Sequence, residues 1–249
     1  GGRMATRRTL STRFDHGAQF YRLKKDIAEL HQGWSQKELS VSWFHSEQGE
    51  HWCARTGMTA LAKSMTNGLE IGLEKQISKI IFDNGQWTIV SDKNEKWNCL
   101  NLILSSPLPQ TVKLLEETSR LNGFDNPKYL QLKKIEYTKA LIALITFKDQ
   151  WSINNHGYEE FDSGDFFSIA DQNKKVVSEI NAHTLTMSAD FSEENFELSD
   201  DVILSKILSS FSSQYPGIAI EEAELKKWRY CKPKTQDQNL FCEMAPNLY

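Results

Sequence analysis

The sequence predicts a mixed fold, α+β and α/β in character, in which a mostly antiparallel sheet is flanked by helices. Three observations predict it. Apolar runs separated by polar turns between 137 and 228 indicate successive strands. A helical repeat then puts Ile203, Ile207 and Phe211 on one face. Asp83-Asn84-Gly85 separates two apolar runs, and Asn-Gly tolerates the positive φ of a tight hairpin.

The composition is that of an ordinary globular protein and excludes several function classes. The chain has 249 residues, 39% hydrophobic and 25% charged, enough for one large domain or two modest ones. A net charge of −4 argues against nucleic-acid or membrane-surface partners, which recruit basic faces. The four cysteines lack metal-ligand spacing, so we expect reduced thiols in a cytoplasmic protein and no metal site. No apolar run has the length of a membrane span.

The first part of the chain predicts short strands and two helices. In order, we expect a strand over 18–21, a helix over 27–34, a strand over 41–44, a polar loop over 46–50 and a helix over 56–65 with Thr56 as its N-cap. The first helix follows from apolar and aromatic residues at helical spacing. In the second helix, Met58, Leu61 and Met65 form one face.

The remaining chain predicts mostly strands. Apolar runs lie at 69–73, 77–82, 87–90 and 100–104, and the last is continuous, as in a strand buried on both faces. A helix through Leu114, Leu115 and Leu121 follows. Further strands are expected over 137–147, 165–170, 176–180, 183–191 and 218–228, with a helix capped by Ser199 before the last of them. A sheet with helices on one face would result.

The opening stretch combines features of an anion site. Two glycines, Gly1 and Gly2, let the backbone approach a ligand closely, because no Cβ intervenes. Arg3 and Arg7 follow them, and guanidinium groups fork onto phosphate oxygens. A solvated basic tail, a cloning remnant or a transit peptide would have the same composition, so these alternatives remain open.

The segments GGRMATRR and FDHGAQF together resemble the second flavin motif of the FAD-dependent amine-oxidoreductase superfamily, specifically its renalase-like branch. Further matches in the same order are Trp52 with Gly57-Met58, the segment 102–110, and Trp228–Tyr230. The resemblance implies an incomplete FAD-binding domain of the Rossmann-like, GR2 type beside a substrate domain. It implies partial FAD-binding segments at 1–33 and 51–107, substrate-domain segments at 34–50 and 108–227, and a return toward the cofactor at 228–249.

FAD is the cofactor that this resemblance implies. The Gly-Gly-Arg would lie against its pyrophosphate, the Asp-x-Gly-Ala-Gln segment beside its isoalloxazine ring, and the backbone of Ile77 toward its adenine. The implied cofactor-binding residues are Gly1, Gly2, Arg3, Met4, Thr6, Arg7, Asp15, Gly17, Ala18, Gln19, Ile77, Ser105 and Pro107.

Five residues are candidates for the substrate side of the flavin. They are His16, Gln19, Phe20, Trp228 and Tyr230. Phe20 stands where the family often has Tyr, so a phenolic hydroxyl is missing there. For His16 a hydrogen-bonded turn histidine is an equal alternative, and the aromatic side chains near the end of the last strand are more often core residues than pocket walls.

The resemblance implies oxidation of a small reductant by hydride transfer to flavin, with O₂ as the electron acceptor. The reductant would be a dihydronicotinamide isomer or an amine. The alternative is a non-enzymatic folded fragment or binding domain, because the sequence has no G-x-G-x-x-G unit to hold a dinucleotide. We expect the first βαβ unit and a closing strand and helix of the family to be missing from this chain.

Overall fold

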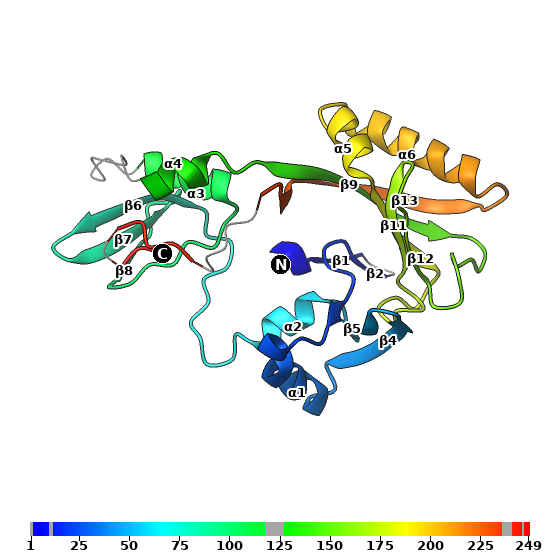
Figure 1. Cartoon of the computed structure of the whole chain (residues 1–249), viewed down its shortest axis with the longest axis horizontal. Coiled ribbons are helices and arrows are strands. Elements are labelled where there is room, and N and C mark those ends of the chain that lie inside the picture. The colour runs from blue at the N-terminus through cyan, green and yellow to red at the C-terminus, as the bar shows by residue number, and fades with distance from the viewer. Residues whose placement is uncertain (1, 10–11, 118–126, 236–240, 246) are drawn as a thin grey trace. The chain divides into compact units, whose positions relative to one another are not determined.

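The computed structural model describes residues 2–9, 12–117, 127–235, 241–245 and 247–249 (Figure 1). The chain divides into two compact units. The first comprises Gly1–Leu69 and Lys139–Cys231, and the second comprises Glu70–Thr138 and Lys232–Tyr249. These boundaries differ from those expected at 33, 50, 107 and 227. The assignment of cofactor and substrate roles to parts of the chain remains a prediction.

The first unit contains a five-stranded sheet with the order β10-β11-β12-β9-β13. Its strands are β9 (Tyr137–Phe147), β10 (Tyr158–Glu160), β11 (Phe166–Asp171), β12 (Ala182–Met187) and β13 (Ile220–Pro233). The pairs β10–β11, β11–β12 and β12–β9 are antiparallel. The predicted antiparallel sheet is therefore confirmed, and β9 has the bounds that the sequence predicts.

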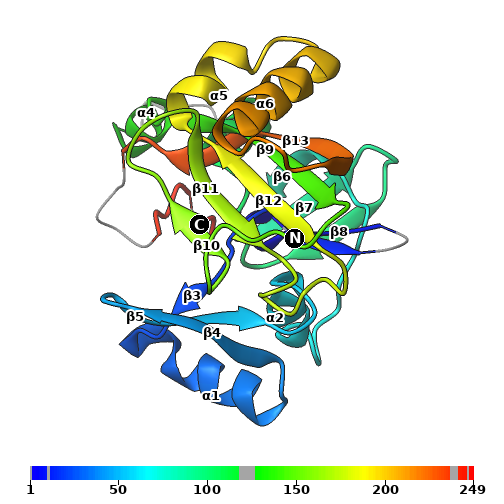
Figure 2. The same cartoon turned by 90° about the vertical axis from the view of Figure 1, so that its right-hand side faces the viewer.

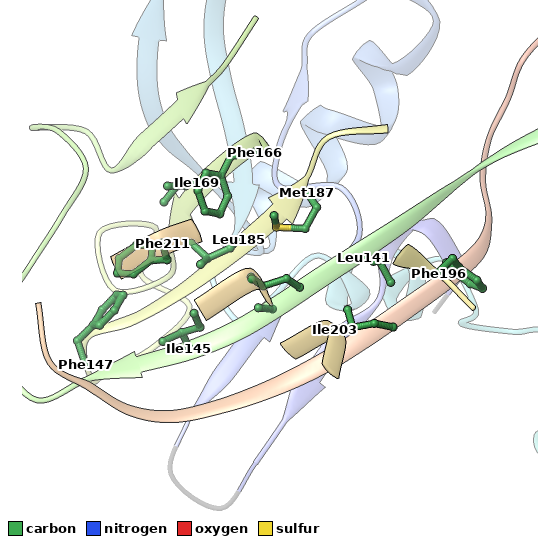
Figure 3. Close-up of a cluster of buried hydrophobic side chains, with 12 residues drawn as sticks. Leu141, Ile145, Phe147, Phe166, Ile169, Leu185, Met187, Phe196, Ile203 and Phe211 are labelled. Atoms are coloured by element: carbon green, nitrogen blue, oxygen red, sulfur yellow. The ribbon is translucent and has the colours of Figure 1, made fainter. Parts of the chain in front are cut away.

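Helices α5 (Ala189–Asn195) and α6 (Asp200–Gln214) pack on one face of this sheet, as Figure 2 shows. Alternate residues of β9, Leu141 and Ile145 among them, point toward Ile203 and Phe211 of α6 (Figure 3). This alternation follows from the two-residue period of a strand, and the facing residues of α6 follow the helical period. The predicted arrangement of helices on one face is confirmed.

The other face of β9 is also apolar. Ala140, Ile142 and Leu144 cluster there with Phe14 and with a residue of β12. Phe14 belongs to a hairpin formed by β1 (Thr6–Arg8) and β2 (Arg13–Asp15). Burial on both faces explains why β9 is continuously hydrophobic. The hairpin carries the opening stretch of the sequence onto this face of the sheet.

A second, three-stranded sheet of the first unit has the order β3-β5-β4. Its strands are β3 (Tyr21–Arg22), β4 (Ser40–Ser46) and β5 (Gly49–Ala54), and the helical segments beside it are η1 (Gly2–Met4), η2 (Lys25–Ile27), α1 (Ala28–Gln36) and α2 (Thr59–Ser64). Trp34 of α1 and Leu61 of α2 are buried against Cys53 of β5. The two predicted helices are present, although α2 begins three residues later than expected.

The second unit is built on a three-stranded antiparallel sheet in the order β6-β7-β8. Its elements are β6 (Ile77–Asp83), β7 (Gln86–Ser91), β8 (Lys96–Cys99), α3 (Leu108–Glu116) and α4 (Pro127–Lys133). Ile80, Trp87 and Leu115 form its buried centre. Asn84 and Gly85 have φ values of 49° and 78°, so the predicted Asn-Gly hairpin is confirmed.

Between β11 and α6, one predicted strand is wrong and another is too long. The segment 176–180 forms a turn, because Val176 adopts a φ of 59° that a strand does not allow. The segment 183–191 is a strand only as far as Met187, and α5 begins after Ser188. Ser188 accepts a hydrogen bond from the Phe191 N–H and so ends the strand by capping the helix.

Two apolar runs assigned to strands between 69 and 107 are also not strands. Leu69 and Leu73 are exposed in irregular backbone. In 100–104, Leu100 and Ile103 are exposed and only Leu102 is buried, where it forms a parallel bridge with Leu248. The third strand of the sheet is the polar β8 instead. The predicted helix residue Leu121 lies outside the described residues.

Smaller differences concern the start of elements. The strand expected over 18–21 is limited to β3, and the predicted loop 46–50 is mostly strand. Thr56 does not cap α2, whose N-cap position is Met58. Gly57, with a φ of 98°, turns the chain just before it. The sequence interpretation did not include the elements β10, α4 and α5.

Candidate functional site

The opening turn η1 presents an accessible backbone. Gly2 has a φ of 49°, and a Cβ atom added to it would have no heavy atom within 4 Å. Arg3 is exposed, and its guanidinium makes no hydrogen bond or ion pair with the described part of the chain. Met4 is half-buried below the turn. A ligand can therefore approach this backbone closely and meet an unpaired cation there. Gly1 lies outside the described residues.

The turn rests on the second predicted segment, residues 15–18. The Ala18 N–H donates to the Arg3 carbonyl at 2.8 Å, and the His16 N–H donates to the Ala5 carbonyl at 3.1 Å. A Cβ atom on Gly17 would lie only 2.3 Å from the Arg3 carbonyl oxygen. Glycine is therefore required at 17 because two backbone segments touch there. The structure brings the two segments together.

Asp15 is fully buried and holds the segments in place. Its Oδ1 accepts hydrogen bonds from the Thr6 hydroxyl and from the Met58 N–H, the latter at 2.8 Å. Its Oδ2 lies 2.8 Å from the Nζ atom of Lys175. A Cβ on Gly57 would collide with Thr6, so this close packing also requires glycine at 57. Both carboxylate oxygens are engaged within the protein, which differs from the predicted direct contact with a cofactor.

Gln19 is likewise engaged within the protein. Its Nε2 donates to the Asp15 carbonyl at 2.6 Å, and its Oε1 accepts from Gln172 Nε2 at 3.0 Å and from Lys175 Nζ at 3.1 Å. The geometry gives Gln19 the role of holding the Asp15 segment. The predicted contact of this amide with a substrate finds no support in these distances.

His16 and Trp228 form a pair on the exposed side of this segment. The Trp228 Nε1–H donates to His16 Nδ1 at 3.3 Å, and the two rings meet edge to face with centroids 5.7 Å apart. Burial, followed by the charge of Lys226, lowers the pKa of His16. Because Nδ1 accepts, the imidazole proton belongs on Nε2. Tyr230 lies two residues farther along β13, on the same face as Trp228.

Phe20 belongs to an aromatic cluster instead of standing beside His16. Its ring centroid lies 4.5 Å from that of His51, 5.2 Å from Tyr158 and 5.9 Å from Phe44. The cluster joins the three-stranded sheet to β10 of the larger sheet. The structure therefore gives Phe20 a packing role. Arg7, predicted to contact the cofactor, forms an exposed ion pair with Glu224 at 3.1 Å.

Two of the three predicted residues of the second unit lie at a cavity within that unit. Ile77 and Ser105 both line an open cavity of about 1260 Å³ within that unit, together with Gln76, Trp97 and Leu102. Pro107, which does not line the cavity, is the N-cap of α3, two residues after Ser105. The structure thus brings Ile77 and Ser105 to one cavity, and their contact with a cofactor remains a prediction.

The sequence interpretation missed three buried polar residues: Lys175, Gln172 and Thr184. The segment 171–175 reads as an ordinary polar turn, and nothing local indicates that Lys175 is fully buried. A buried lysine needs a countercharge, and here that charge is Asp15, 160 positions earlier in the chain. Only the tertiary structure brings the two together.

Comparison with known families decides the assignment of the chain. The family described as flavin containing amine oxidoreductase matches residues 35–236. The chain belongs to this flavin-containing amine oxidoreductase family. A flavin, generally FAD, is the cofactor that the family implies. The opening motif lies before the matched residues, so its relation to the flavin rests on the resemblance and geometry described above.

Two solved structures resemble the chain in fold. One, described as "Putative protoporphyrinogen oxidase" from Exiguobacterium sp. 255-15, has 16% identity and a TM-score of 0.56, over 76% of this chain and 42% of that one. The other, an oxidoreductase from Methanosarcina mazei, has 15% identity and a TM-score of 0.57, over 80% of this chain and 49% of that one. The flavin-containing amine oxidoreductase chain thus spans less than half the length of these structures.

The residues of the opening turn fit the anionic part of a flavin dinucleotide. The space beside Gly2 leaves the backbone open, and the Arg3 guanidinium is available for a phosphate. In the part of the chain that the structure describes, no group of three or more His, Cys, Asp or Glu side chains is arranged to hold a metal ion. None of the described helices is both long and apolar enough to span a membrane.

Proposed function

We propose that this chain is part of a renalase-like, FAD-dependent oxidoreductase that oxidises a small reductant. The reductant is a dihydronicotinamide isomer or an amine, and O₂ accepts the electrons. The observation that carries the proposal is the contact of Gly17 with the Arg3 carbonyl, together with the Ala18–Arg3 hydrogen bond. This contact joins the two segments that the resemblance assigns to the flavin. The family match supports flavin chemistry in general.

The flavin, when bound, supplies the hydride acceptor, so the protein has to bind, orient and shield the reactants. Gly2 would let the backbone approach the pyrophosphate, and Arg3 would offset its negative charge. Asp15 and Gln19 hold the Gly2–Met4 turn in place through the buried contacts described above. Ile77, Ser105 and Pro107 remain predicted cofactor-binding residues in this proposal, and of these only the backbone of Ile77 is assigned to the adenine.

The substrate side of the proposed site is formed by His16, Trp228 and Tyr230. Trp228 holds the His16 ring through its indole N–H, which leaves the Nε2–H of the imidazole without a hydrogen-bond partner in the described part of the chain. The lowered pKa keeps His16 neutral near pH 7. A neutral donor suits a substrate carbonyl or carboxamide, because it polarises the group without adding a charge near the flavin.

Titration of the purified chain with FAD tests the proposal. We expect quenching of tryptophan fluorescence and retention of flavin absorbance after gel filtration. Arg3→Gln should weaken binding about tenfold, which corresponds to about 1.4 kcal/mol for a lost charge-assisted hydrogen bond. Arg13→Gln is the matched control, because Arg13 is also an exposed arginine but lies at the far end of the hairpin. A chain that takes up no FAD contradicts the proposal.

Substrate class is decided by turnover of the FAD-loaded protein. Dihydronicotinamide isomers and primary or secondary amines are supplied separately under air, and flavin reduction and O₂ consumption are followed. Reduction by the dihydronicotinamide isomers alone supports the renalase-like proposal, whereas reduction by amines alone supports the amine substrate. FAD uptake without reduction by either class supports the alternative, a folded binding domain without enzymatic activity. A cytoplasmic location is part of the proposal.

A further inference from the structure

Lys175 is a fully buried lysine directly below the predicted flavin segment. Its side chain has an exposed fraction of 0%, and it lies in the turn that follows β11. The Nζ atom lies 2.8 Å from Asp15 Oδ2 and 3.1 Å from Gln19 Oε1. It also stands 5.4 Å from the centre of the Trp43 ring, within the range of a cation–π contact.

Each polar group of Asp15 has a partner in the same network, which is a hydrogen bond for all of them except Oδ2, whose partner is the ion pair with Lys175. The Asp15 N–H donates to Gln172 Oε1 at 3.1 Å, and the Asp15 carbonyl accepts from Gln19 and from the Thr184 hydroxyl at 2.8 Å. The carboxylate joins Thr6, Met58 and Lys175, as described above. Asp15 therefore links β1, the start of α2, the turn that follows β11, and β12.

A chain of hydrogen bonds connects Asp15 to the opening turn. The Thr6 N–H donates to Thr59 Oγ1 at 2.9 Å, and the Thr59 hydroxyl donates to the Met4 carbonyl at 2.7 Å. From the other side, the backbone contacts of Ala18 and Gly17 hold Arg3. A displacement of the Asp15 carboxylate would therefore be passed to the turn along two routes.

A buried ion pair is a poor device for stability alone. Removing two charges from water costs much of what their attraction returns, and an apolar pair of equal volume commonly stabilises as well. Unlike an apolar contact, the polar contacts of this ion pair depend on direction, so they hold the atoms that they join in one orientation. This pair contacts the Asp15–Gln19 segment, which the resemblance assigns beside the flavin ring, where orientation matters most.

We infer that Lys175 is a positioning residue. Through Asp15 and Gln19 it fixes the segment 15–18, and through that segment it fixes the Gly2–Met4 turn in the conformation that receives the anionic group of a flavin dinucleotide. The identity of that ligand rests on the proposed function. The positioning of the turn does not depend on a ligand, so it can be measured on the ligand-free chain.

Three variants test the inference. Lys175→Met removes the charge and leaves the Asp15 carboxylate buried without its countercharge. Asp15→Asn combined with Lys175→Met removes both charges. Lys174→Met is the matched control, because the neighbouring Lys174 Nζ donates only to the Asn154 and Asn155 carbonyls at the surface.

Hydrogen exchange of the ligand-free chain gives the first measurement. In Lys175→Met, amides of residues 2–8 should exchange at least tenfold faster than in the wild type, whereas those of β9 keep most of their protection. The double variant should fall between the two, and Lys174→Met should match the wild type. FAD affinity should follow the same order, with a loss of at least tenfold in Lys175→Met.

Two results overturn the inference. The first is that the amides of residues 2–8 exchange at the wild-type rate in Lys175→Met. Lys175 would then only occupy space in the core and would not position the turn. If Lys175→Met does not fold, the double variant decides instead, and wild-type exchange of residues 2–8 there overturns the inference. If the wild-type chain does not bind FAD, only the proposed function is contradicted. The exchange measurement on the ligand-free chain still tests whether Lys175 positions the opening turn.

Discussion

Gly17 and Arg3 touch so closely that no side chain fits between them. A Cβ atom on Gly17 would lie 2.3 Å from the Arg3 carbonyl oxygen, and the neighbouring Ala18 N–H donates to the same oxygen. Real Cβ atoms do not approach an oxygen so closely. Any larger residue at 17 must therefore push the opening turn away from the segment that supports it.

Gly17→Ala should destabilise the chain by about 1–3 kcal/mol, the usual cost of overpacking, and displace the opening turn. Urea unfolding measures the first effect and FAD titration the second. Gly33→Ala is the control, because a Cβ at 33 meets no atom within 4 Å and lies inside α1. That variant should gain about 0.5–1 kcal/mol from helix propensity. Equal stabilities of the two variants would contradict the close contact.

Ser188 and Ser199 both precede helices, but only Ser188 caps one with its side chain. The Ser188 hydroxyl accepts from the Phe191 N–H at 3.3 Å, whereas Ser199 makes no such bond. Ser188→Ala should therefore cost about 1 kcal/mol of stability. Ser199→Ala, a surface change, should cost less than about 0.5 kcal/mol. Thermal or urea unfolding of the two variants distinguishes them, and the reverse order would refute the assignment of the cap.

Local signals in the sequence predicted the parts of the fold that local forces determine. The apolar face of α6 and the Asn84-Gly85 turn are recognisable without any partner, and both are present. The runs 69–73 and 100–104 look equally apolar, yet they form no strand, because the polar β8 pairs with β7 instead. Which segment completes a sheet depends on partners that are distant in the sequence.

The same distinction holds in the candidate site. The glycines and arginine of the opening turn form a recognisable motif, and the structure packs that turn against residues 15–18, the second segment of the resemblance. The buried partner Lys175 could not be predicted, because its environment comes from residues far away in the chain. Gln19 shows the converse case, since the motif indicates a pocket residue and the tertiary contacts engage its amide completely.

His183 should make the stability of the chain depend on pH. It is fully buried between Phe147 and Trp151, and burial lowers its pKa to about 4, although the Asp171 carboxylate acts in the opposite direction. The unfolded chain, with a histidine pKa of about 6.5, then binds the proton more tightly than the folded chain. Stability is complete above pH of about 6.5 and falls as the pH drops toward 4, by about 3 kcal/mol at most.

Urea unfolding between pH 7.5 and 4.5 measures this dependence. His183→Gln should have a shallower pH dependence than the wild type, because one proton-linked group is removed. Some dependence should remain, since burial also lowers the pKa of His16 and His51. His45→Gln is the control, because the side chain of His45 is 72% exposed and pairs with Glu50 at the surface, so its removal should change the slope much less than His183→Gln does. An unchanged slope in His183→Gln would exclude this linkage.

Trp228 should determine the protonation state and tautomer of His16. Its indole N–H donates to Nδ1, which favours the neutral ring with the proton on Nε2. Trp228→Phe keeps an aromatic ring and removes only this donor, so the pKa of His16 should rise toward its ordinary value. The ring should then also populate the Nδ1–H tautomer. Two-dimensional ¹H–¹⁵N spectra of the imidazole nitrogens, recorded as a function of pH, measure both changes.

A matched change elsewhere separates this effect from a general loosening of the aromatic residues. Trp43→Phe also removes an indole donor, but that donor bonds the His156 carbonyl and not an imidazole. It should therefore leave the His16 signals as they are. If Trp228→Phe leaves the His16 titration and tautomer unchanged, Trp228 only packs against the ring. The donor role of the Nε2–H in the proposed site then loses its support.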